Sequence, residues 1–334
     1  MKRKILSGFI ILAFLLPLIL FVLNSQPTSN LASQKHFDID SLSNKMSIKV
    51  LTFNAGLFEL YVFGIPFIKP ADFLEQRLES MPIEILKVNA DVIGLQEVYT
   101  KRHQDYLVEN LKGTYPYHYY QRNRAVKANN GLMYFSKYPI IYKGYYPLKN
   151  RGPLDERVVV QKGILTCIID FGEVGKVQFI NIHPTAGGFL YQQDSPEIIK
   201  IRSSQITQAF EFSEKNTSLP SIILGDFNAG PEIAVENYQL LIEKGFADAY
   251  HAFCQAKNLD ALITWDSENL LNQRGTHPDA ISQRIDHIYI SPSLQKNFSI
   301  YDAKRVFDET IVKTNGDLVT ISDHYGVVVQ LLKD

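Results

Sequence analysis

Short apolar runs, separated by polar segments and by Gly, Pro, Asn or Asp residues, recur along most of the chain. Runs of this length that contain many β-branched residues predict buried β-strands. A helical period of apolar positions appears in residues 71–88, 197–212 and 234–244. The runs expected to form strands are residues 48–53, 92–95, 131–135, 164–169, 177–182, 221–224, 285–290 and 327–331.

Strand and helix blocks follow one another from residue 47 to the C-terminus without a repeat, a low-complexity tract or a second linker. Sheets in such chains bury their apolar faces against each other or against helices. We therefore expect residues 47–334 to form one large α/β (α+β) domain, with two β-sheets and helices on the outside.

The first 46 residues have a different pattern. Residues 5–23 are almost entirely apolar and follow three basic residues, and as a helix they would span roughly 28 Å, close to a bilayer core. The basic flank favours an N-terminus in the cytoplasm. We interpret residues 1–23 as a signal-anchor or a signal peptide and residues 24–46 as a polar linker. The domain would then lie outside the cytoplasm, membrane-anchored, or secreted if the leader is cleaved.

Composition and charge narrow the class of protein. The chain has 334 residues, 46% of them apolar, with 34 Lys and Arg, 35 Asp and Glu, and 2 Cys. This composition excludes a disordered chain and a disulfide scaffold. Because three of the basic residues lie in the leader, the domain itself is net negative, which argues against a nucleic-acid binder held by bulk charge.

Polar and acidic side chains lie at the ends of several predicted strands, where functional residues collect on rigid scaffolds. Carboxylates and amides together form the oxygen-rich set that a hard octahedral cation prefers. A histidine oriented by a carboxylate, here Asp286, is a candidate acid or base. These are the parts of metal-assisted phosphoryl chemistry. The other candidates are Asn54, Glu97, His183, Asp226, Asn228, Asp323 and His324.

Seven short motifs occur in order across the domain: LTFN (51–54), GLQE (94–97), NGLM (130–133), NIH (181–183), LGDFN (224–228), RIDH (284–287) and SDH (322–324). Together they resemble the endonuclease/exonuclease/phosphatase superfamily. The resemblance implies a four-layer sandwich, in which two packed, mainly antiparallel β-sheets are flanked by helices. It also implies a Mg²⁺ site at one edge, and Mn²⁺ shares the same preference for oxygen ligands.

The resemblance also implies a role for each matching residue. Glu97 would be the principal metal ligand, with Asn54 beside it and Asp323 close to the metal.

The catalytic residues implied by the resemblance surround the phosphate. Asp226 and Asn228 would orient the attacking water and the phosphate, and His183 would donate a hydrogen bond to a phosphoryl oxygen. His324, oriented by Asp286, would be the general acid or base. Both Asp226 and His324 remain candidates for the general base.

Within the superfamily the chain is most similar to neutral sphingomyelinases. Asn130, in the motif that leads into SKYPI at 136–140, resembles their second block, and Asp155 with Lys162 resembles an acid and lysine pair between their central blocks. These three residues would bind substrate. The implied reaction is Mg²⁺-dependent hydrolysis of sphingomyelin to ceramide and phosphocholine. The apolar segment 57–68, which would lie at the rim of the cleft, could contact acyl chains or pack as ordinary structure.

Three alternatives remain. A metal-dependent nuclease would need a basic groove, which the net negative charge disfavours. An inositol-phosphate or phosphoinositide phosphatase is less similar, because residues 280–283 read AISQ where that group carries a block with Trp, Cys and Asp. A non-catalytic binding module of the same fold is the third. As partners we expect a phospholipid substrate in a membrane, no nucleic acid and no obligate protein.

Overall fold

The computed structural model describes residues 46–62, 65–68, 71–121, 129–188, 192–215, 219–275, 280–314 and 316–334. The predicted leader and all of the predicted linker except residue 46 lie outside these ranges. Within them, no helix combines the length and the apolar character that a membrane span requires.

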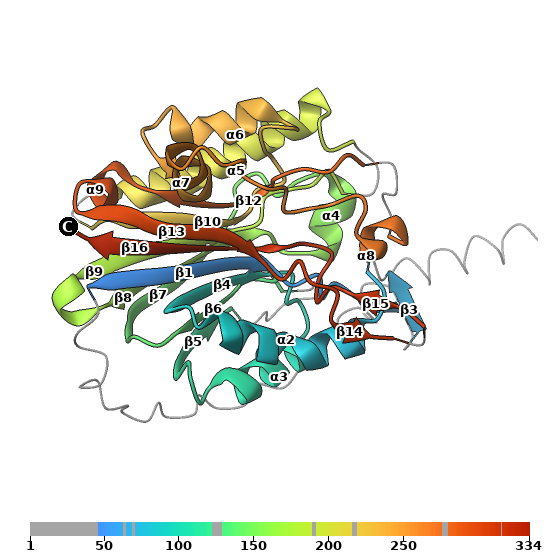
Figure 1. The fold of residues 1–334 in the computed structure, drawn as a ribbon. Coiled ribbons are helices and arrows are strands. Elements are labelled where there is room, and N and C mark those ends of the chain that lie inside the picture. The colour runs from blue at the N-terminus through green and yellow to red at the C-terminus, as the bar shows by residue number, and fades with distance from the viewer. Residues whose placement is uncertain are drawn as a thin grey trace, which may run out of the picture.

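Two six-stranded sheets form the centre of the molecule, and every predicted strand is present in one of them (Figure 1). One pair in each sheet is parallel, β1 with β4 and β9 with β10, and the other pairs are antiparallel. The first sheet runs β13 (Phe298–Val306), β16 (Gly326–Lys333), β1 (Ser47–Asn54), β4 (Val92–Gln96), β6 (Met133–Ser136) and β5 (Tyr117–Tyr120). The second runs β11 (Ala247–Asp248), β12 (Asp286–Ile290), β10 (Ser221–Asp226), β9 (Lys176–Ile182), β8 (Gly163–Asp170) and β7 (Ile140–Pro147).

Helices cover the outer faces of both sheets, so the predicted four-layer arrangement is confirmed (Figure 1). The first sheet is covered by α2 (Leu74–Val88) and α3 (Lys101–Leu111), and the second by α5 (Pro196–Glu214) and α6 (Val235–Ile242). The shorter elements are the pairs β2 (Leu60–Val62) with β3 (Ile65–Ile68) and β14 (Val312–Lys313) with β15 (Leu318–Val319), together with α4 (Leu154–Val159), η2 (Gly172–Val174), α7 (Ala249–Ala256), α8 (Leu270–Gln273) and α9 (Pro292–Gln295).

The core is divided among three interfaces between the layers, and apolar residues of β1 (SIKVLTFN) contribute to two of them. Val50 packs between the two sheets, whereas Leu51 and Phe53 face α2 and α3, and all three side chains are fully buried. Because successive side chains of a strand point to opposite faces, a strand with both faces covered carries apolar residues on both of them. The third interface lies between the second sheet and its helices.

A buried ion pair lies where the second sheet meets α6 and α7. The Arg284 guanidinium contacts the Asp248 carboxylate, and both side chains are 1% exposed. Nη2 of Arg284 donates to the Tyr238 hydroxyl at 3.0 Å, and His287 Nδ1 lies 3.1 Å from Asp248 Oδ2. Although burial alone would raise the pKa of Asp248, Arg284 and His287 hold it well below its usual value. The pair therefore stays ionised inside the fold.

The two parallel pairs decide where functional groups meet. Between β1 and β4 the chain crosses over through α2, and between β9 and β10 it crosses over through α5. The carboxyl ends of the four strands lie at one edge of the sandwich, as the contact between Asn54 of β1 and Asp226 of β10 shows. Ligands bind outside the carboxyl ends of strands in many α/β folds.

Candidate active site

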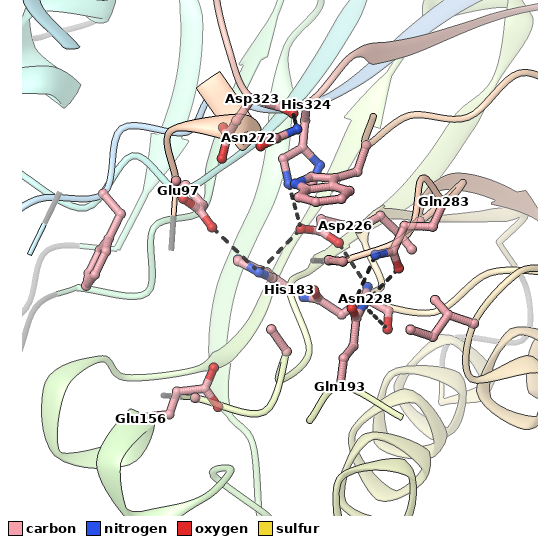
Figure 2. Close-up of a pocket in the computed structure, with 18 of the residues that line it drawn as sticks. Glu97, Glu156, His183, Gln193, Asp226, Asn228, Asn272, Gln283, Asp323 and His324 are labelled. Atoms are coloured by element: carbon pink, nitrogen blue, oxygen red, sulfur yellow. Dashed lines mark hydrogen bonds and ion pairs between the residues drawn. The ribbon is translucent and has the colours of Figure 1, made fainter. Parts of the chain in front are cut away.

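Asp226, the last residue of β10, lies at the centre of the candidate site and is 2% exposed. Its Oδ2 accepts a hydrogen bond from Nδ2 of Asn54 at 2.9 Å, and its Oδ1 accepts one from the backbone N–H of Asn228 at 2.9 Å. Nε2 of His183 lies 3.5 Å from Oδ2, and Nε2 of His324 lies 3.8 Å from it. The carboxylate is thus surrounded by four polar groups, of which Figure 2 shows His183, Asn228 and His324.

The surroundings of Asp226 favour its charged form. Burial alone would raise its pKa, but His324, His183 and the hydrogen bonds from Asn228 and Asn54 together lower it below the ordinary value. A carboxylate that accepts several hydrogen bonds stays ionised in a buried site. Asp226 can therefore hold and orient a water molecule or accept a proton from one.

His324 forms a pair with Asp286, the first residue of β12. Its Nδ1 lies 2.9 Å from Oδ2 of Asp286, whose side chain is fully buried. Burial lowers the pKa of His324, but the carboxylates of Asp286 and Asp226 outweigh it and raise the pKa to about 10. At neutral pH the imidazole therefore carries a proton on Nε2, on the side of Asp226.

His183, the residue after β9, has the opposite protonation state. Burial and the positive charge of Lys162 lower its pKa to about 3. Its Nε2 lies between Asp226 Oδ2 at 3.5 Å and Glu97 Oε1 at 4.0 Å. Two histidines about one carboxylate are therefore held in different charge states, which suits one as a proton donor and the other as a neutral hydrogen-bonding group.

Glu97 follows β4 in a left-handed conformation with φ of 60°, which is unusual for a residue with a long side chain. Backbone strain of this kind collects at functional sites. Burial and the negative charge of Asp323 raise the pKa of Glu97 to about 7. The Asp323 carboxylate lies close to the backbone of residue 56. Only glycine leaves room for it there, because a Cβ at Gly56 would lie 2.0 Å from Asp323 Oδ1.

The Glu97 and Asp323 carboxylates fit a divalent cation. Burial and the negative charge of Asp323 raise the pKa of Glu97 by more than His324 and Lys162 lower it, and a cation beside the two carboxylates would favour their charged forms. Asn54 adds an amide oxygen, which already accepts a hydrogen bond from the Gly56 backbone N–H at 3.0 Å. The set of carboxylate and amide oxygens suits Mg²⁺ or Mn²⁺.

A second group of possible ligands consists of Asp226, Asp286 and His324, whose ligand atoms lie within 4.8 Å of one another. In this group Nδ1 of His324 already forms a hydrogen bond with Oδ2 of Asp286, and the surrounding carboxylates raise the pKa of His324 to about 10. A metal ligand must give up its proton to bind. We therefore assign the candidate metal site to the Glu97 side of the cavity.

The site opens into a cavity of about 760 Å³ (Figure 2). Of the residues predicted for the site, Glu97, Lys162, His183, Asp226, Asn228, Asp323 and His324 line it. Asn54 and Asp286 lie behind this lining and contact Asp226 and His324.

Glu156, rather than its predicted neighbour Asp155, lines the cavity and pairs with Lys162. Lys162 Nζ lies 3.1 Å from Glu156 Oε1 and donates to the Pro184 carbonyl at 3.0 Å. Successive residues of a helix point about 100° apart, so α4 can direct only one of the two acids at the lysine. Asp155 lies against Gly188 instead.

Asn130 is also outside the cavity lining. Its Oδ1 accepts the backbone N–H of Leu132 at 2.7 Å, which closes the turn before β6. The substrate-binding roles of Asp155 and Asn130 stay predictions.

Several cavity residues were not predicted because they lie in irregular segments without a recognisable pattern. Gln193 and Gln283 form a reciprocal amide pair at 3.1 and 3.3 Å, and Gln193 Nε2 also donates to the Asn228 carbonyl at 3.0 Å. Trp265 and Asn272 line the cavity as well. The amide pair braces Asn228, and with it the neighbouring Asp226.

Comparison with known proteins agrees with this arrangement. The model of the Endonuclease/Exonuclease/phosphatase family matches residues 51–324. A curated relative, "Putative neutral sphingomyelinase" of Drosophila melanogaster, is 23% identical over 293 residues, which are 84% of this chain and 61% of that protein. The chain thus spans only part of the length of that relative.

Solved structures of the same fold include a sphingomyelinase and a toxin that contains bound magnesium ions. Sphingomyelinase C from Streptomyces griseocarneus superposes with a TM-score of 0.65 at 20% identity, covering 85% of this chain and 99% of that one. A variant beta toxin from Staphylococcus aureus with bound magnesium ions superposes with a TM-score of 0.62 at 17% identity, covering 85% and 99%. At these identities the likeness establishes the fold.

Proposed function

Because the chain belongs to the endonuclease/exonuclease/phosphatase family, we propose that it is a Mg²⁺-dependent phosphodiesterase that hydrolyses a phosphosphingolipid, sphingomyelin, to ceramide and phosphocholine at a membrane surface. The observation that carries the proposal is the placement of the Asp226 carboxylate between Nε2 of His183, at 3.5 Å, and Nε2 of His324, at 3.8 Å, beside the acid pair Glu97 and Asp323. The putative sphingomyelinase relative supports this substrate.

The charges of the cavity support a zwitterionic substrate. Besides the histidines, the lining contains five carboxylates and one cationic side chain, Lys162, which is paired with Glu156. A nuclease needs cations along its groove to replace the counterions of the phosphate backbone, and a phosphoinositide carries several negative charges. A choline headgroup brings a positive charge of its own. This lining therefore favours a phosphocholine ester over both alternatives.

In the proposed reaction a water molecule attacks phosphorus opposite the ceramide oxygen. The new bond joins the water oxygen to phosphorus, and the bond from phosphorus to the ceramide oxygen breaks. Asp226 orients the water and accepts its proton, while Nε2 of His324 gives its proton to the departing alkoxide. His183 donates a hydrogen bond to a phosphoryl oxygen, and Asn228 supports Asp226.

A divalent cation held by Glu97, Asp323 and Asn54 would supply stabilisation of negative charge that develops on the phosphate. The side chains of the protein hold the cation and connect it to the reacting groups. Glu97 and Asp323 are placed to hold the cation, and Asn54 joins the two halves of the site because its Nδ2 donates to Asp226.

Membrane contact at the cavity mouth is part of the proposal. Ile281 lines the cavity and is 56% exposed, and Phe58 of the lining is separated from the β2–β3 hairpin by one residue. Apolar groups at the rim of a site favour a lipid surface over a soluble substrate. The predicted leader, residues 1–23, would keep the domain close to a membrane, and no nucleic acid or obligate protein partner is proposed.

The proposal is tested by phosphocholine release from sphingomyelin vesicles, with phosphatidylcholine vesicles, phosphoinositide vesicles and plasmid DNA in parallel, each with Mg²⁺ and with EDTA. We expect Mg²⁺-dependent release from sphingomyelin. Faster cleavage of DNA or of a phosphoinositide than of sphingomyelin would overturn the substrate assignment, and equal release with EDTA would overturn the metal assignment.

Replacement Glu97→Gln is expected to raise the Mg²⁺ concentration for half-maximal activity by at least about 10-fold, because a charged ligand is lost. Without Mg²⁺ the variant should be at least as stable as the wild type, since the repulsion from Asp323 is removed. The measurements are a Mg²⁺ titration of activity and Tm with and without Mg²⁺. Glu214→Gln, on the exposed end of α5, is the control and should change neither.

Replacement Asp286→Asn is expected to lower kcat at neutral pH by about 10- to 100-fold and to move the alkaline limb of the pH profile to lower pH. An acid works only while protonated, so activity is lost as pH rises through its pKa. The Asp286 carboxylate helps to raise the pKa of His324 against the effect of burial, and its removal lowers that pKa. Asp170→Asn, at the end of β8, should leave the profile unchanged. An unchanged alkaline limb in Asp286→Asn would contradict His324 as the acid.

A further inference from the structure

The segment that contains Thr264 and Trp265 crosses the site without belonging to either sheet. Trp265 forms isolated antiparallel bridges with Gln283 on one side and with His324 on the other. Thr264 is fully buried behind it. The segment therefore contacts both of the chain regions that carry the histidine and its carboxylate partner.

Thr264 makes hydrogen bonds to both regions at once. Its hydroxyl oxygen accepts the backbone N–H of Ile285 at 3.0 Å and that of Asp286 at 3.0 Å. Its carbonyl oxygen accepts the backbone N–H of Tyr325, the residue after His324, at 2.7 Å. One residue thus fixes the main chain beside each member of the Asp286–His324 pair.

The pair needs such a connection because its members come from different sheets. Asp286 begins β12 of the second sheet, whereas His324 precedes β16 of the first. A sliding of one sheet past the other would lengthen the 2.9 Å hydrogen bond between them. Apolar packing between sheets resists separation but is not directional.

Asp266 provides a second connection between the same two regions. Its Oδ1 accepts the Ser282 hydroxyl at 3.0 Å, and its Oδ2 accepts the Tyr325 hydroxyl at 3.3 Å. Both contacts are partly buried, whereas those of Thr264 to Ile285 and Asp286 are fully buried. The Thr264 contacts also adjoin the reacting pair directly.

We propose that Thr264 is a positioning residue, which holds Asp286 and His324 at hydrogen-bonding distance across the two sheets through its hydroxyl and carbonyl oxygens. The inference rests on the proposed function only in that His324 acts in the reaction. Thr264 itself is not among the residues that line the cavity, so its effect is on the geometry of the pair and not on substrate binding.

The test compares Thr264→Val, which keeps the shape and removes the hydroxyl, with Thr264→Ser, which keeps the hydroxyl. We expect Thr264→Val to lower kcat by about 10- to 100-fold, the scale of small misplacements of a catalytic group, with KM within about 2-fold. Thr264→Ser should keep kcat within about 3-fold. Thr166→Val is the matched control, because Thr166 is also fully buried and its hydroxyl donates to the Phe179 carbonyl in the core.

Two measurements separate positioning from general damage. Trp265 is the single tryptophan of the chain, so its emission reports directly whether the segment stays folded in each variant. The Nδ1–H proton of His324, hydrogen-bonded to Asp286, should give a downfield proton NMR signal that is absent in His324→Ala. We expect this signal in the wild type and in Thr264→Ser, and its loss in Thr264→Val.

Thr264→Val with wild-type kcat and an unchanged NMR signal would overturn the inference. Equal losses of kcat in Thr264→Ser and Thr264→Val, or an equal loss in Thr166→Val, would also overturn it, because the effect would then be structural. The NMR readout needs no substrate. A wild-type protein that is inactive on sphingomyelin but shows the signal pattern therefore contradicts the proposed function and leaves the role of Thr264 intact.

Discussion

Replacement His324→Ala is expected to lower kcat for phosphocholine release by about 10³- to 10⁴-fold, the range for removal of a general acid or base held by a carboxylate. The structure gives the reason. The proton that would go to the departing alkoxide is lost with the imidazole. Single-turnover release from sphingomyelin vesicles measures the chemical step directly.

The matched control is His251→Ala, at an exposed position of α7, which should leave kcat unchanged. Truncation leaves the buried Asp286 carboxylate without its His324 partner, so Tm is expected to fall in His324→Ala, and kcat is compared at a temperature at which the variant is folded. A folded variant that retains more than about a tenth of wild-type kcat would contradict a role for His324 in proton transfer. Asp226 would then be the remaining candidate for the acid or base.

Replacement Arg284→Ala is expected to lower the free energy of unfolding by about 3–5 kcal/mol, because it leaves the Asp248 carboxylate buried without its main partner. The guanidinium also lies over the Tyr238 ring, with 5.3 Å from Cζ to the centroid, so packing is lost as well. Equilibrium urea unfolding followed by circular dichroism provides the measurement.

Two comparisons identify the cause of the loss. Lys112→Ala breaks an exposed pair with Glu109 and should cost less than about 1 kcal/mol. The double variant Arg284→Met with Asp248→Leu removes both charges and should recover a large part of the loss. A double variant no more stable than Arg284→Ala would mean that packing, and not the unpaired charge, dominates.

The sequence predicted the inner strands of both sheets and missed the strands at their edges. The edge strands of the two sheets are β13 and β5, and β11 and β7. An edge strand has a partner on one side only, and exposed positions interrupt its apolar period. In β13 a register shift between Ile300 and Asp302 further breaks the alternation. Such strands are specified by tertiary pairing rather than by a local pattern.

The grouping of the site residues could be predicted for a related reason. Asn54, Glu97, His183 and Asp226 each follow or end an inner strand, and the parallel pairs bring those ends to one edge. Thr264 could not be found in this way, because its segment has no periodic pattern and its role depends on contacts with distant backbone groups.

The antiparallel pairing of β1 with β16 has a consequence for synthesis of the protein. β1 is the first strand of the first sheet to be translated, and β16, its eight-residue partner, is the last. The ribosome therefore releases β1 long before one of its two neighbours exists, which leaves a hydrogen-bonding edge open in the nascent chain. Asn54 and His324, 270 residues apart in sequence, meet only after the segment before β16 has left the ribosome, so the site is assembled late in synthesis.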